Sequence, residues 1–149
     1  MTGSVCEISR QRPAALTVGQ GGQLVLWAMR CWLDGRRCWH MVQTEFLATF
    51  GLAGGLDALE ELEAALAILD GHARRILKLC PEGTARISPD EQLVLQTVEA
   101  ARAGSIELLQ MGAASLVPRA QQSLLIRHLS RFADFMERRN LDCSVRAPL

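Results

Sequence analysis

The stretch DALEELEAALAILDGHARRILKLC, residues 57–80, decides the fold class. Its apolar residues recur at alternating spacings of three and four, which places them on one face of a helix. Acidic residues come first and basic residues last, an order that complements the helix dipole. The pattern predicts one long helix that Pro81 ends, with a heptad seam on which Gly71 is the weak point. The positions of this seam are Leu59, Leu62, Leu66, Leu69, Ala73, Ile76 and Cys80.

The residues that follow carry the start signal of another helix. Ser88 is an N-cap, Pro89 suits the first helical position, and Glu91 completes a capping box. We expect a helix over residues 88–102 that Gly104 ends, a short helix over 106–116, and a long final helix from Pro118 to about residue 140. On the final helix, the apolar face contains Leu125, Leu129, Phe132, Phe135 and Met136, and the opposite stripe contains Arg127, Arg131, Asp134 and Arg138.

Two further helices are predicted upstream, where a turn at Asp34-Gly35 separates two apolar helical faces. The first face contains Leu24, Trp27, Ala28 and Cys31, and the second contains Trp39, Val42, Phe46 and Phe50. We found no convincing strand pairing. The chain is therefore predicted to be all-α, a single-domain bundle of five or six helices over residues 19–141, between an irregular N-terminal arm at 1–18 and a loose tail at 142–149.

Composition limits the classes of function. The chain has 149 residues, 49% of them apolar and 21% charged, with 16 basic and 16 acidic residues. This balance argues against a disordered chain, and zero net charge disfavours nonspecific binding to nucleic acid or to a membrane surface. No segment resembles a membrane span or a signal peptide, and the five cysteines have irregular spacings. We expect a soluble cytoplasmic protein with mostly free thiols.

Charge is uneven along the chain. Residues 51–113 hold five basic and ten acidic residues, a net −5, and residues 114–149 hold six and three, a net +3. Three interpretations are open: solvated faces, charge pairing inside the bundle, or complementary faces that meet in a homodimer.

Cys31, Cys38 and His40 are the metal-ligand candidates, because thiolate and imidazole are zinc ligands. Their spacing, C-x6-C-x-H, matches no established zinc signature, and a fourth ligand would have to come from Cys80 or elsewhere. The alternative is that Cys31 simply packs on the apolar face of its helix.

The interface candidates are apolar. Trp27 and Trp39 fit buried faces, whereas Trp32 lies on neither face. Trp32 is either exposed, as an anchor at an interface is, or it covers the end of the helical hairpin. The seam residues Leu59, Leu62, Leu66 and Leu69 are either internal to the bundle or part of an interface.

No catalytic residue and no cofactor site are assigned. The chain assembles no nucleophile, base and orienting group, so the prediction leans away from an enzyme. Gly19-Gln20-Gly21-Gly22 precedes a helix but lacks a dinucleotide or phosphate-loop pattern.

The stretch from Cys80-Pro81 through Ile87-Ser88-Pro89-Asp90-Glu91-Gln92-Leu93 and on to Met136 resembles a family of small all-helical bacterial proteins with no assigned activity. The resemblance covers about the last two-thirds of the chain. It implies a helical fold and transfers no catalytic residue.

The sequence thus predicts a noncatalytic interaction protein whose partner is itself, as a homo-oligomer, or another protein. One alternative is a bundle that holds a small ligand or metal near Cys31, His40 and Trp27. A second is a DNA-binding regulator that uses the arginine stripe of the last helix.

Overall fold

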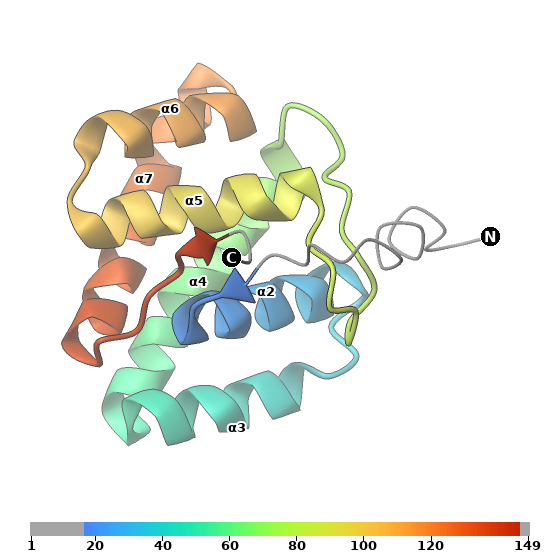
Figure 1. Cartoon of the computed structure of the whole chain (residues 1–149), viewed down its shortest axis with the longest axis vertical. Coiled ribbons are helices and arrows are strands. Elements are labelled where there is room, and N and C mark those ends of the chain that lie inside the picture. The colour runs from blue at the N-terminus through green and yellow to red at the C-terminus, as the bar shows by residue number, and fades with distance from the viewer. Residues whose placement is uncertain (1–16, 147–149) are drawn as a thin grey trace.

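The computed structural model describes residues 17–146 and confirms an all-α, single-domain bundle (Figure 1). Within the described residues the helices are α2 (Gln20–Leu33), α3 (Trp39–Phe50), α4 (Leu52–His72), α5 (Pro89–Ala103), α6 (Ile106–Leu116) and α7 (Arg119–Arg138). The short strands β1 (Thr17–Val18) and β2 (Val145–Arg146) pair antiparallel. None of the described helices combines the length and the apolar character needed to cross a lipid bilayer.

The centre of the bundle is α4, which packs against both α3 and α7. Its seam residues Leu59, Leu62, Leu66 and Leu69 are each 1–3% exposed, so the seam is internal to the chain. Phe46 of α3 stacks on Phe132 of α7 at 6.2 Å between ring centroids, and both rings are fully buried in the core. The helix α5 packs on both α6 and α7.

The long helix predicted over residues 57–80 ends early, at His72. Ala73 is extended and Ile76 is 91% exposed, so the last part of the predicted seam is wrong. Hydrogen bonds to distant residues replace the helix: the backbone N–H groups of Lys78 and Cys80 donate to the carboxylates of Asp90 and Glu91. Cys80 is also disulfide-bonded, so it is an exception to the expectation of mostly free thiols.

The predicted capping box of α5 is confirmed. The Oγ of Ser88 accepts a hydrogen bond from the N–H of Glu91 at 3.1 Å, and the Glu91 carboxylate accepts one from the N–H of Ser88 at 2.8 Å. Gly104 ends α5 in the left-handed conformation, with φ 77°. These local signals determine where α5 begins and ends.

The segment after α7 is anchored, contrary to the expectation of a loose tail from residue 142. Cys143 is fully buried, and the N–H of Gly22 donates to the Asp142 carbonyl at 2.9 Å. A Cβ on Gly21 would lie 2.9 Å from the same carbonyl oxygen. The glycines in the first turn of α2 therefore leave room for the C-terminal segment, and β1 joins residues 17–18 of the expected arm to β2.

Candidate functional site

Two of the three candidate metal ligands meet in the structure. Cys31 lies near the end of α2 and Cys38 is the N-cap of α3, so the turn between the two helices brings both thiols together. The third member of the cluster is Glu82, in the segment between α4 and α5. The ligand atoms of these three residues all lie within 4.8 Å of one another. His40 is exposed on the first turn of α3 and lies outside this cluster.

A hydrogen bond fixes the position of Glu82. The indole Nε1 of Trp27 donates to Glu82 Oε2 at 2.7 Å, which leaves Oε1 facing Cys38, whose Sγ is 3.9 Å away. No sequence signal identified Glu82, because 44 residues separate it from Cys38 and no local spacing connects them.

The two thiols differ in environment. Cys31 is 2% exposed, whereas Cys38 is half-buried. Burial raises the pKa of the Cys31 thiol to about 12, and the nearby Glu82 carboxylate and Cys38 add to the rise. Two sulfur atoms and one carboxylate oxygen can hold a metal that accepts thiolate ligands, and the same two thiols can form a disulfide.

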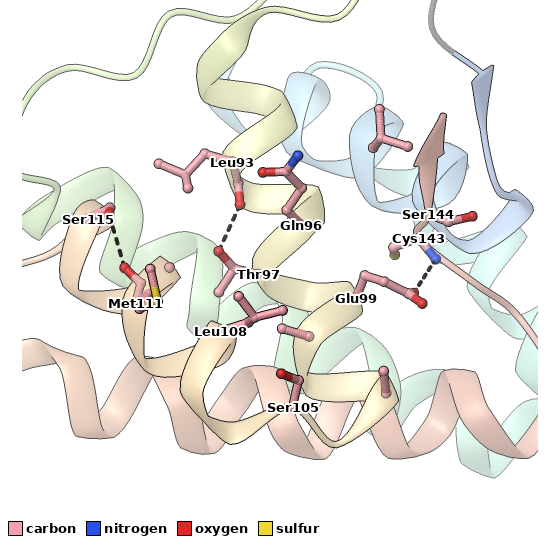
Figure 2. Close-up of a pocket in the computed structure, with 14 residues that line it drawn as sticks. Leu93, Gln96, Thr97, Glu99, Ser105, Leu108, Met111, Ser115, Cys143 and Ser144 are labelled. Carbon is pink, nitrogen blue, oxygen red and sulfur yellow. Dashed lines mark hydrogen bonds between the residues drawn. The ribbon is translucent and has the colours of Figure 1, made fainter. Parts of the chain in front are cut away.

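A second feature is an apolar groove of about 540 Å³ between α5, α6 and the segment that leads into β2 (Figure 2). Leu93 and Ala100 of α5, Leu108 and Met111 of α6, and Val145 of β2 contribute its apolar surface.

The polar side chains of the groove are largely satisfied by the protein itself. Thr97 Oγ1 donates to the Leu93 carbonyl at 2.7 Å, and Ser115 Oγ donates to the Met111 carbonyl at 3.0 Å. The Glu99 carboxylate accepts from Arg102 and from the N–H of Cys143, which holds the Glu99 pKa below its usual range. The groove therefore offers mainly apolar contact.

Close approach of two helices shapes this groove. Gly112 of α6 faces Thr97 of α5, and a Cβ at Gly112 would lie 2.9 Å from the Thr97 Cβ. Glycine at this position lets α6 lie directly on α5, and the side chains of Leu108 and Met111 then stand at the edge of the groove, 58% and 64% exposed.

The predicted interface residues are buried instead. Trp32 is 6% exposed, because Trp39 packs edge-on against it at 5.2 Å and the guanidinium of Arg36 lies over its ring at 3.6 Å. The exposed position allowed for Trp32 is wrong, and its burial under Trp39 and Arg36 agrees with the alternative that it covers the end of the hairpin. The internal seam of α4 is likewise inaccessible to a partner.

The arginine stripe of α7 faces the acidic residues of α4. His128 Nδ1 lies 2.8 Å from Glu61 Oε1, and Arg131 Nη1 lies 3.8 Å from Glu61 Oε2. Asp57 and Glu60 line the same cavity as Arg131 and Arg138. A stripe flanked by acids in this way is a poor surface for a phosphate backbone, so it offers no support for the DNA-binding alternative.

No family model, curated protein or solved structure matched this chain when it was compared with known proteins. The resemblance to a family of small helical bacterial proteins stays a prediction.

Proposed function

We propose that this chain is a noncatalytic interaction protein that pairs with a second copy of itself through the groove between α5, α6 and β2. One observation carries the proposal: Leu108 and Met111 stand largely exposed beside an apolar groove. Burying a large apolar side chain stabilises a contact by roughly 1.5–3 kcal/mol. If a partner covers both side chains and fills the groove, the burial of each side chain stabilises the complex.

The surface favours a protein partner. A small molecule in the groove contacts the inner side of Leu108 and Met111 and leaves their outer side in water. A helix laid along α6 covers both sides. The helix α6 has 11 residues, a length of about 16 Å, which is enough for such a contact.

The arrangement also favours a second copy as that partner. A two-fold interface uses the same patch on both subunits, so the patch must be complementary to itself. Here a ridge, made by Leu108 and Met111, lies directly beside a groove, and in a two-fold pair each ridge enters the other copy's groove. The outer position of α6 in the bundle leaves room for this packing (Figure 1). The acid in the groove, Glu99, is already paired with Arg102, so the contact buries no unpaired charge from it.

The test is the molecular mass in solution, measured by sedimentation and by native mass spectrometry over a range of concentrations. We expect the wild-type chain to approach twice 16.4 kDa. The double variant Leu108→Glu/Met111→Glu should be a folded monomer, since both side chains are exposed in the single chain. The matched control is Leu52→Glu, at a 79% exposed position on the first turn of α4, and it should still pair.

Two results would contradict self-association through this surface. One is a wild-type chain that stays monomeric up to high micromolar concentration. The other is a dimer that the double variant leaves intact while the protein remains helical by circular dichroism.

A second candidate is the binding of a small apolar molecule in the same groove. Its volume of about 540 Å³ lies within the range of small-molecule pockets, about 300–1,000 Å³. A monomer that retains extra mass in native spectra, and loses it in the double variant, would favour this candidate over pairing.

A further inference from the structure

We propose that Cys31, Cys38 and Glu82 form a zinc-binding site at the junction of α2, α3 and the segment before α5. This site lies apart from the groove and does not depend on the proposed pairing. Its residues come from three segments of the chain, so the folded structure, and not a local sequence motif, creates it.

The geometry is close to that of a tetrahedral zinc site. With Zn–S near 2.3 Å and Zn–O near 2.0 Å, tetrahedral coordination puts two sulfurs about 3.8 Å apart and a sulfur about 3.5 Å from an oxygen. The Sγ of Cys38 lies 3.9 Å from Glu82 Oε1, and the three ligand atoms lie within 4.8 Å of one another. Rotamer adjustments of less than about 1 Å bring all three into contact with one ion.

The carboxylate of Glu82 is already oriented for this role. Trp27 Nε1 donates to Oε2 at 2.7 Å and leaves Oε1 directed at the thiol of Cys38. Outer hydrogen bonds of this kind hold the ligands of metal sites in place and tune their affinity. Trp27 is therefore a positioning residue for the metal ligand.

The donor set selects the metal. Two thiolates and one carboxylate suit zinc, whereas magnesium and calcium take oxygen ligands. Cys31 is buried and Glu82 is exposed, so the ion has a protein side and a solvent side. Three protein ligands leave a fourth position, which water occupies from the solvent side. Binding replaces the thiol protons of both cysteines, and the ion then joins the two helices to the segment that contains Glu82.

The experiment is a titration of the full chain, treated with chelator under anaerobic conditions, with Zn²⁺ against a competing chromophoric chelator. Co²⁺ serves as a spectroscopic probe, because thiolate-to-cobalt charge transfer reports sulfur ligation. We expect one zinc per chain and a charge-transfer band. Cys38→Ser should weaken zinc binding and lower the intensity of the band, because one of the two sulfur ligands is lost. Glu82→Gln should weaken zinc binding and leave the band intensity of the loaded protein unchanged. Trp27→Phe should weaken binding by roughly 10–100-fold.

Two matched controls separate this site from unspecific thiol binding. Cys143→Ala removes a buried thiol elsewhere, and His40→Ala removes the exposed histidine that the sequence spacing selected. Both should bind zinc as the wild type does. Cys38 and Glu82 are not core residues, so their variants should keep the helical circular dichroism of the wild type.

Three results would overturn the assignment. The first is a wild-type chain that takes up no zinc at micromolar free metal. The second is equal zinc affinity in wild type and Cys38→Ser. The third is an isolated protein in which Cys31 and Cys38 are joined as a disulfide, shown by peptide mapping, because that bond removes both sulfur ligands.

Discussion

At the scale of single residues, Glu91 does more than cap the N-terminus of α5, because its carboxylate also bonds to two other segments of the chain. Its carboxylate is fully buried and accepts from Arg30 Nε at 2.7 Å, from the N–H of Cys80 at 3.1 Å and from the N–H of Ser88 at 2.8 Å. The capping box predicted only the last of these bonds. One carboxylate thus holds α2, the segment after α4 and the start of α5 together.

Glu91→Ala should therefore destabilise the fold strongly. Removing one partner of a buried ion pair leaves Arg30 buried without its counter-charge, which costs about 3–5 kcal/mol. Urea unfolding measures the change. Glu137→Ala, which removes the exposed partner of Arg102, is the control and should cost less than about 1 kcal/mol. Equal losses in the two variants would mean that burial of the Arg30–Glu91 pair does not matter.

Asp90 predicts a dependence of stability on pH. The Arg75 guanidinium, which donates to Asp90 at 2.8 Å, holds the Asp90 pKa below its usual range, and the N–H of Lys78 adds to this. A carboxyl whose pKa is lower in the folded state stabilises the fold above its unfolded pKa, near 3.9. This contribution is lost as the pH falls through the folded-state pKa.

Asp90→Asn should consequently lower the free energy of unfolding at pH 7 by about 1.5–3 kcal/mol, the range for hydrogen bonds to charged groups. The gap between wild type and variant should narrow as the pH falls below about 4. Urea unfolding at a series of pH values measures the gap. Asp70→Asn, at an exposed position of α4, is the control. A gap that is constant from pH 7 to pH 3 would contradict this origin.

At the scale of the elements, local signals predicted the helices, and long-range bonds decided where one of them ends. The capping box at Ser88 and the glycine at 104 act within one turn of chain, so sequence alone placed α5 correctly. The seam pattern continued to Cys80, but Asp90 and Glu91 capture the backbone N–H groups of residues 78 and 80. No helical periodicity carries information about acceptors more than ten residues away.

The cluster of Cys31, Cys38 and Glu82 likewise combines a local contact, which the sequence indicated, with a long-range contact, which it did not. Cys31 and Cys38 were paired from sequence because one short turn joins their helices. The spacing also suggested His40, but the first turn of α3 places that side chain in solvent. Glu82 comes from a segment whose path depends on the early end of α4, so a prediction that extended α4 to Cys80 had no means to locate it.

The packing of α6 on α5 predicts opposite effects for two glycine-to-alanine changes. Gly112→Ala puts a Cβ within 2.9 Å of the Thr97 Cβ, and Thr97 is 1% exposed and unable to move aside. Overpacking of this kind costs about 1–3 kcal/mol. Gly71→Ala, in the last turn of α4, meets nothing within 4 Å and should stabilise by up to about 1 kcal/mol. Thermal unfolding compares the two, and stabilisation by Gly112→Ala would show that the α5–α6 contact is looser than described.

At the scale of the whole molecule, opposite charges meet inside one chain. The acidic middle segment and the basic end of the sequence allowed complementary faces between two copies. The structure brings part of both together, since Glu61 of α4 lies against His128 and Arg131 of α7. Among the described residues, the exposed feature on which the proposed pairing rests is the apolar ridge and groove at α6.

Because the proposed interface is apolar and the alternative interface is charged, the salt dependence of dimerisation distinguishes between them. Raising the ionic strength from about 0.1 M to about 1 M shortens the Debye length from about 10 Å to about 3 Å, which weakens contacts between exposed charges. An apolar contact keeps its strength under the same change. We therefore expect the dimer dissociation constant, measured by sedimentation in NaCl, to change less than threefold over this range, whereas a dimer held by complementary charges would dissociate in high salt. Such dissociation would reject the α6 surface as the interface and would favour an interface formed by the charged faces of α4 and α7.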